Sequence, residues 1–360
     1  MQNHCRHQTG NKSSSGCLPD PYPENPDAMA DDGDLAMNLE FWMTNLPQKL
    51  KSVPVIHLAI PGSHDSFTSS ITMKSRIAPD ADNIIKKMSW LGPLLKYFMV
   101  NWSRTQSLSA MEQLEKGIRY FDLRIATKRN TNDLYIVHGL YADKVQNVLD
   151  TIVSFLESHP QEIVILDCQH FYAFEHSDHE RLMQMFNKTF GTKLLPYSDH
   201  IEYVTLEYMI LQYRYQVIAV YRSDAARFGQ PMFWPSCSFP NPWPNTVSTT
   251  KLFAVLDYGL KNRKPNNSYI SQCILTPSYG FIITHLFSTL KQKCATDFEK
   301  QKLDWIDHQK PGETGMNVVI TDFVELSDCK YVKDVINLNE LLLNMKSSDT
   351  VVTTLDEYAK

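Results

Sequence analysis

The chain of 360 residues has no excess of positive charge. Its 35 lysine and arginine residues stand against 40 aspartate and glutamate residues, giving a formal net charge of −5 at pH 7. This balance argues against a strongly basic surface for nucleic acid as the main function, although it leaves a local patch open. Hydrophobic residues make up 43% and charged residues 21%, which is typical of a globular protein.

Cysteine is sparse, and no Cys-x-x-Cys motif occurs. The odd number and wide spacing of the cysteines favour a reducing compartment and argue against a structural zinc site. The seven positions are Cys5, Cys17, Cys168, Cys237, Cys273, Cys294 and Cys329. Residues 1–20 lack the apolar core of a signal peptide. No window approaches the roughly 18 apolar residues of a transmembrane span, so we expect a soluble intracellular protein.

The domain organisation is predicted from composition. Residues 1–34 are polar and rich in Ser, Asn, Pro and Asp, which predicts a disordered N-terminal tail. Residues 35–345 contain no long linker and are expected to form one domain. Residues 346–360 are expected to form a C-terminal tail.

Short apolar runs alternate with helical patterns along this domain. Helical spacing between Val145 and Leu156, ended by Pro160, predicts a helix, and Ser109 with Glu112 predicts a capping box at the start of another. The predicted strands are Val55–Ile60, Arg119–Ile125, Leu134–His138, Glu162–Leu166, Gln216–Tyr221, Gln272–Leu275 and Asn317–Ile320. Alternation of this kind implies a parallel sheet, and about eight strands favour an α/β barrel. No Gly-x-Gly-x-x-Gly follows a strand, which disfavours a dinucleotide-binding fold.

Reactive side chains follow the predicted strands where they end. In a β/α barrel the carboxyl ends of the strands form the site, so these side chains are expected to converge. The residues at these ends are His64, Asp65, Asp122, Arg124, His138, Gln169, Arg222 and Asp322. Asp122 and Arg124 are two positions apart on one strand and therefore share a face.

This set of side chains suits the cleavage of a phosphodiester. One histidine can take a proton from an attacking hydroxyl while the other protonates the leaving oxygen, because imidazole titrates near neutrality. An arginine can hold the phosphoryl oxygens, and a carboxylate can fix the tautomer of a histidine. His64, His138 and Arg124 supply the first three groups, and Asp65, Asp122 or Asp322 can supply the carboxylate.

Three segments resemble the X region of phosphatidylinositol-specific phospholipase C (PI-PLC). They are Ala-Ile-Pro-Gly-Ser-His-Asp-Ser (59–66), Gly-Ile-Arg-Tyr-Phe-Asp-Leu-Arg (117–124) and Val-His-Gly (137–139). Residues 164–172, 275–277 and 321–324 extend the likeness, which runs from about Leu39 to Leu342. Within this family the chain is similar to the animal PI-PLC X domain-containing proteins, which consist of this domain alone.

The resemblance implies a distorted (β/α)8 barrel of the TIM type and a hydrolase of lipid metabolism and signalling. Such an enzyme cleaves phosphatidylinositol with the inositol 2-hydroxyl as the nucleophile. It implies His64 as general base and His138 as general acid, Arg124 as the phosphate-binding cation paired with Asp65, and Asp322 as the carboxylate that orients His64. It also implies four substrate-binding residues, which are Asp122, Gln169, Arg222 and Tyr279. Arg222 and Tyr279 are the weaker matches.

The resemblance further implies that no cofactor is required. Signalling members of the family bind calcium through carboxylates on the second and fourth strands. Arg124 and Gln169 stand where two of those acids would be. A guanidinium near the phosphate makes the cation redundant and repels it, so we expect a metal-independent site.

The implied partner is phosphatidylinositol in a membrane, bound peripherally and transiently. We expect no nucleic acid, no transmembrane span and no obligate protein partner, and a cytoplasmic location with nuclear presence left open. Two aromatic segments, residues 90–102 and 233–243, are candidates for membrane contact. The alternative is that they only cover the barrel.

Two other functions compete with this hypothesis. One is a catalytically weak module that binds inositol lipids. The other is a glycerophosphodiester phosphodiesterase, which normally needs a carboxylate cluster for metal that the sequence does not show. Ser63 invites a serine-hydrolase interpretation, but Gly-x-Ser-x-Gly does not surround it.

Overall fold

The computed structural model describes residues 37–81 and 92–344. The predicted tails 1–34 and 346–360 lie outside these residues. One nine-stranded sheet runs through the described chain, in the order β7-β6-β5-β2-β1-β9-β8, with β3 and β4 joined to β2. The strands are β1 Ile60–Ser63, β2 Tyr120–Thr127, β3 Leu134–His138, β4 Leu140–Lys144, β5 Val164–Tyr172, β6 Val217–Tyr221, β7 Phe233–Trp234, β8 Ile270–Gln272 and β9 Val318–Thr321.

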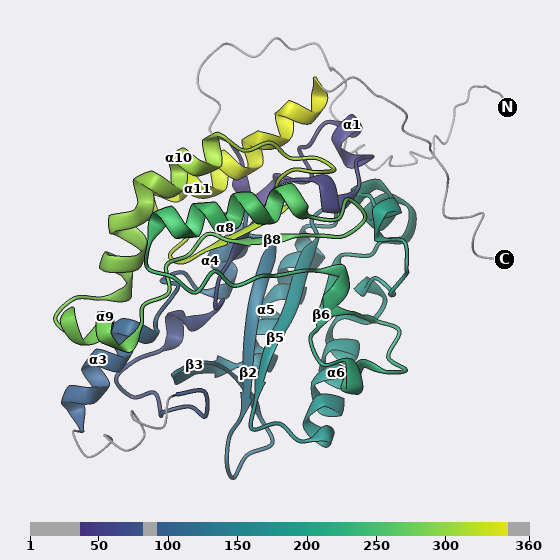
Figure 1. Cartoon of the computed structure of the whole chain (residues 1–360). Coiled ribbons are helices and arrows are strands. Elements are labelled where there is room, and N and C mark those ends of the chain that lie inside the picture. The colour runs from purple at the N-terminus through teal and green to yellow at the C-terminus, as the bar shows by residue number, and fades with distance from the viewer. Residues whose placement is uncertain (1–36, 82–91, 345–360) are drawn as a thin grey trace, which may run out of the picture. The chain divides into compact units, whose positions relative to one another are not determined.

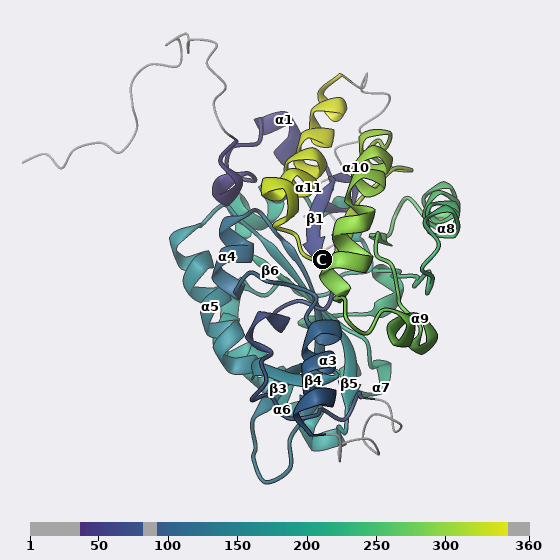
Figure 2. The same cartoon turned by 90° about the vertical axis from the view of Figure 1, so that its left-hand side faces the viewer.

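The seven strands along this path are parallel to their neighbours. The sheet curls, and helices cover its outer surface. Figure 1 shows β2 and β5 through the middle of the molecule with α6 on one side and α8 on the other. Figure 2 shows α4 and α5 on the side opposite to α8. The α/β barrel that the sequence predicts is confirmed in this distorted form.

Two of the helices lie where sequence signals predict them. Ser109 and Glu112 form the predicted capping box at the start of α4, and α5 covers the predicted helical pattern. The helices are α1 Gln48–Lys51, α3 Pro93–Ser103, α4 Ala110–Glu115, α5 Val145–Ser158, α6 His176–Phe190, α7 Asp224–Arg227, α8 Thr249–Asn262, α9 Tyr279–Thr284, α10 Glu299–Asp307 and α11 Leu326–Asn337. Within the described ranges, no helix has the length and apolar character needed to cross a bilayer.

Three predictions about strands are wrong. The predicted strand Gln272–Leu275 shares only Gln272 with β8, and residues 273–275 follow the strand without regular structure. Val55–His57 is a short 3₁₀ helix, and β1 begins only at Ile60, whose amide donates to the Asn317 carbonyl at 2.8 Å. The apolar run before it is buried as predicted, but burial does not require an extended backbone. β3 is antiparallel to β2 and forms a hairpin with β4. It therefore lies off the barrel path, which contains seven strands rather than about eight.

The barrel stays open between β7 and β8. In the described residues no strand pairing joins these two strands. The segment after β7 crosses the opening instead. Its carbonyls at Ser238 and Pro240 accept from the amides of Ser268 and Ile270, both at 3.0 Å. The Gln272 amide adds a side-chain bond of 2.7 Å to Asn241, so hydrogen bonds from an irregular segment complete the wall.

Gly62 lies in β1, shortly before His64 and Asp65, where strands pack too closely for a side chain. A Cβ there would lie 2.8 Å from Ile320 Cγ2 and 3.0 Å from the Tyr120 side chain. We predict that Gly62→Ala lowers the free energy of unfolding by about 1–3 kcal/mol, because overpacking a core forces side chains and backbone to shift.

Urea denaturation measures this loss. Gly280→Ala in α9 is the matched control, because a Cβ there meets only Ser278 Oγ, at 3.9 Å. An equal stability of the Gly62→Ala protein and the wild type would contradict the close approach of β1 to its neighbours.

Candidate active site

The loop that follows β1 carries His64 and Asp65 into the top of the barrel. Asp65 has a positive φ of 39°, a conformation that Asp tolerates better than most residues. Backbone bonds hold both sides of the loop: the His64 amide donates to the Thr321 carbonyl at 3.0 Å, and the Ser66 amide donates to the Asp122 carbonyl at 2.9 Å. The loop is thus tied to β9 and to β2.

Two side chains that sequence reasoning missed hold the backbone of this loop in place. The Gln106 amide donates to the carbonyls of His64 and Thr321, both at 2.9 Å, and the Thr105 hydroxyl donates to the Asp65 carbonyl at 2.8 Å. Both residues are fully buried. They lie in the connection between β1 and β2, where no periodic pattern points to a role.

His64 is held by the carboxylate that the resemblance assigned to it. Its Nδ1 lies 2.8 Å from Asp322 Oδ1, directly after β9. Burial alone would lower the pKa of His64, but the carboxylates of Asp65 and Asp322 outweigh burial and raise it to about 9. Arg124 opposes this shift, with Nη2 3.2 Å from His64 Nε2.

The Asp65 carboxylate lies between three nitrogen-bearing groups. It forms an ion pair with Arg124 from β2, and its Oδ2 lies 3.5 Å from His64 Nε2 and 3.2 Å from His138 Nε2. Burial would raise the pKa of Asp65, but the neighbouring Arg124, His64 and His138 lower it to about 2. Arg124 itself is held cationic, because its pKa is raised by Asp65 and Asp122 against the effect of burial.

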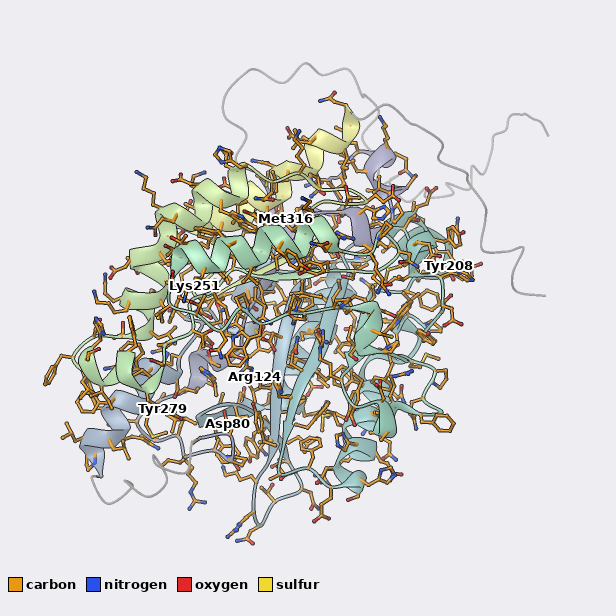
Figure 3. The ribbon with its side chains drawn as sticks, in the orientation of Figure 1. Asp80, Arg124, Tyr208, Lys251, Tyr279 and Met316 are labelled. Carbon is orange, nitrogen blue, oxygen red and sulfur yellow. The ribbon has the colours of Figure 1, made fainter. Side chains whose placement is uncertain are left out.

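Asp122 lies beneath this group and accepts the Asp65 amide at 3.3 Å. Burial raises its pKa to about 6, with Arg124 opposing the shift and the Asp65 charge adding to it. Asp122 and Arg124 both face the cluster, as their shared strand face predicts. Figure 3 shows Arg124 on β2 in the interior of the barrel.

A second carboxylate–arginine pair lies beside the first. Arg222, after β6, donates Nε and Nη2 to Asp167 of β5 at 2.9 and 2.7 Å, and Nη2 also donates to the Phe239 carbonyl at 2.7 Å. The Tyr120 hydroxyl at 2.6 Å and the Gln169 amide at 3.3 Å donate to the same carboxylate. Asp167 was missed by sequence reasoning, although a charge inside an apolar strand is a signal of a paired site.

The structure therefore brings together His64, Asp65, Asp122, Arg124, His138 and Asp322, and places Arg222 and Gln169 around Asp167. Tyr279 begins α9, and its side chain is 49% exposed. Its role as an inositol platform stays a prediction. Of the two aromatic segments, Phe233, Trp234 and Phe239 are buried and cover the barrel, whereas Trp243 is 56% exposed. Trp90 lies outside the described residues.

The cluster also contains atoms of the kind that bind metals. Ligand atoms of His64, Asp65 and Asp122 lie within 4.8 Å of one another. The Arg124 guanidinium, however, is paired with Asp65 and faces His64 Nε2. A divalent cation there would have to displace a positive charge from its carboxylate, so these residues suit calcium poorly.

The comparisons with known proteins agree with this fold. The model of the family "Phosphatidylinositol-specific phospholipase C, X domain" matches residues 96–210. The structure is similar to phosphatidylinositol-specific phospholipase C from Listeria monocytogenes, with a TM-score of 0.55 and 19% identity over 84% of this chain and 98% of that one. A Staphylococcus aureus enzyme of the same name, with a pentafluoro-phenylalanine incorporated, gives a TM-score of 0.57 and 15% identity over the same shares.

These features define a barrel of the PI-PLC kind. The chain is 41% identical to PI-PLC X domain-containing protein 2 of Mus musculus over 304 residues, which cover 84% of this chain and 88% of the relative. It is 38% identical to PI-PLC X domain-containing protein 3 of Homo sapiens over 84% of this chain and 94% of that relative. The chain belongs to the family of PI-PLC X domain-containing proteins.

The raised pKa of His64 makes a prediction about stability. Its protonated form is favoured in the folded protein, so this contribution is full below about pH 6.5 and is lost as the pH rises through about 9. We predict that the stability difference between wild type and His64→Gln shrinks by about 3 kcal/mol between pH 6 and pH 9.5. Urea denaturation at several pH values measures it.

His57→Gln is the control for this experiment. Burial lowers the pKa of His57, so the stability difference between wild type and His57→Gln should not shrink as the pH rises and should be constant well above pH 6.5, where this histidine is neutral in the folded and the unfolded chain. A His64→Gln difference that stayed constant from pH 6 to 9.5 would contradict the electrostatic arrangement around His64.

Proposed function

We propose that this protein is a phosphodiesterase of the phospholipase C type that cleaves phosphatidylinositol without a metal. The observation that carries the proposal is the placement of both imidazoles and the Arg124 guanidinium around one carboxylate, that of Asp65. A phosphate group entering this space meets a cation and two groups able to transfer protons.

In the first step, His64 acts in its neutral form, and its Nε2 takes the proton of the inositol 2-hydroxyl. The oxygen attacks phosphorus, the bond to the glycerol oxygen breaks, and His138 gives its proton to that oxygen. The products are diacylglycerol and inositol 1,2-cyclic phosphate. In hydrolysis of the cyclic product the two histidines exchange roles, with water as the nucleophile. Arg124 stabilises the developing charge, and Asp322 stabilises the His64 imidazolium.

The arginine pairs support metal independence. Asp65 lies in the loop after β1 and Asp167 lies within β5, and each is bound by a guanidinium. The Arg222–Asp167 pair supplies a second polar region beside Asp65, where we place the inositol hydroxyls together with Gln169 and Asp122. The sequence alternative of a glycerophosphodiester phosphodiesterase is less well supported, since that chemistry normally uses a metal-binding carboxylate cluster, and here the Arg124 guanidinium is paired with the Asp65 carboxylate that a metal would need.

The lipid substrate requires contact with a bilayer, and a surface beside the site suits it. We define the α3–α9 surface as Leu94, Tyr97, Ile283 and Phe287, all more than half exposed. Ring contacts of 6.1 Å between Phe98 and Phe287 and 6.2 Å between Trp102 and Phe281 join its two parts. Exposed apolar groups beside a site that takes a lipid fit the interfacial region of a membrane.

An assay on phosphatidylinositol vesicles tests the catalytic proposal. We expect wild-type activity to survive EGTA, because Arg124 supplies the positive charge. His64→Ala and His138→Ala should each lower kcat by about 10²–10⁴-fold, the usual size of one proton transfer. Release of inositol phosphates measures the rate.

His308→Ala serves as the matched control, because this histidine lies on the surface at the end of α10. Activity abolished by EGTA would overturn metal independence. Vesicle binding without turnover on phosphatidylinositol or its phosphorylated forms would instead support the second candidate, a module that binds inositol lipids.

The α3–α9 surface makes a separate prediction. The double variant Leu94→Ser, Phe287→Ser should lose most of its binding to phosphatidylinositol vesicles in a flotation assay, because it removes apolar area from the membrane contact. Its rate on water-soluble inositol cyclic phosphate should stay unchanged. Phe228→Ser, another exposed aromatic position, is the control. Unaltered flotation of the double variant would show that this surface does not meet the bilayer.

A further inference from the structure

We infer that Asp80 is a positioning residue for His138, the proposed general acid. This inference rests on the proposed function. Neither the sequence motifs nor the geometry of the two arginine pairs assigns a role to Asp80, which lies outside the strands, in the connection between β1 and β2. Figure 3 shows Asp80 on the same side of the molecule as Arg124.

The first observation concerns the corner that carries His138. β3 ends at His138 and β4 begins at Leu140, so Gly139 alone makes the turn, with a φ of +67°. The direction of the His138 side chain therefore depends on one peptide unit. Such a tight turn needs its polar groups satisfied, because the corner is packed against Ser103.

The second observation is that the segment from Ala78 to Asp80 supplies hydrogen-bond partners for both backbone groups of Gly139, its amide and its carbonyl. The Gly139 amide donates to Asp80 Oδ2 at 2.6 Å, and the Gly139 carbonyl accepts the Ala78 amide at 3.0 Å. The imidazole is held on its other side, where Nδ1 lies 2.9 Å from the Ser103 carbonyl at the end of α3. If Nδ1 carries the hydrogen of that bond, Nε2 is the atom that faces Asp65 and the substrate space.

The third observation is the free energy cost of Asp80. Its other oxygen, Oδ1, is buried and accepts no hydrogen bond from the described residues. Burial raises the pKa of Asp80, which shows that this environment disfavours the charge. The burial of this carboxylate is unfavourable, and it lies beside the proposed general acid. Its position therefore points to a function in orienting the His138 side chain.

The orientation of a general acid affects the reaction rate only where the leaving group needs a proton. Diacylglycerol leaves as an alkoxide unless His138 protonates it, whereas 4-nitrophenolate is a stable anion and leaves unprotonated. We therefore compare two water-soluble substrates: dibutyroyl phosphatidylinositol and the 4-nitrophenyl ester of inositol 1-phosphate. His138→Ala provides the reference pattern, with a much larger loss on the first substrate than on the second.

Asp80→Ala is expected to lower kcat/KM about 10- to 100-fold on dibutyroyl phosphatidylinositol, the size of effect that misplacing a catalytic group by about 1 Å produces. On the nitrophenyl ester the loss should be no more than about threefold. Asp80→Asn should recover most of the loss, because its amide oxygen can still accept the Gly139 amide.

Gly139→Ala disturbs the same corner from the other side, since its Cβ would lie 2.9 Å from Ser103 Oγ. It should reproduce the selective loss and keeps the test valid if Asp80→Ala does not fold, which thermal unfolding reports. Equal losses on both substrates, or no loss on either, would overturn the inference. A wild-type protein that cleaves neither substrate would overturn the proposed function itself.

Discussion

The Asp65 carboxylate is the contact on which the site depends. It is fully buried, and three groups from different parts of the chain approach it: the Arg124 guanidinium, His64 and His138. A buried carboxylate is stable only with such partners, because its desolvation is costly. Asp65 thus gathers these three groups around one carboxylate.

The same arrangement occurs at Asp167, where Arg222, Tyr120 and Gln169 donate to one buried carboxylate. The interior of this barrel is therefore apolar at its lower end and ionic at the carboxyl ends of its strands. The apolar part supplies rigidity, because buried side chains such as Ile320 and Ile165 pack at the density of a protein core. The ionic part supplies the proposed chemistry.

Sequence reasoning predicted the residues at strand ends well. His64, Arg124 and Asp322 converge because neighbouring parallel strands carry side chains to the same rim of a barrel. His138 reaches this rim differently, from the end of the antiparallel strand β3. β3 was placed wrongly in the parallel sheet, since alternation of apolar residues does not distinguish a hairpin strand from a barrel strand. The 3₁₀ helix at Val55–His57 shows a similar limit: apolar residues predict burial better than they predict backbone conformation.

Other residues were not predicted from the sequence for a different reason. Asp80, Thr105 and Gln106 lie in the long connection between β1 and β2, which has no repeating pattern to fix its path. Their roles arise from hydrogen bonds to backbone groups of remote segments, such as Gly139 and Thr321. Such contacts depend on the final packing and leave no trace in local composition.

The opening between β7 and β8 has a consequence for solubility. A closed barrel has no free strand edges, whereas this one has two, and unpaired edges can recruit strands of other molecules. Here β7 has two residues and β8 three, too short to template a stable ladder. The segment across the opening also contains Pro235, Pro240, Pro242 and Pro244, which offer no amide hydrogen to an incoming strand. The irregular seam thus protects the molecule against edge-to-edge aggregation.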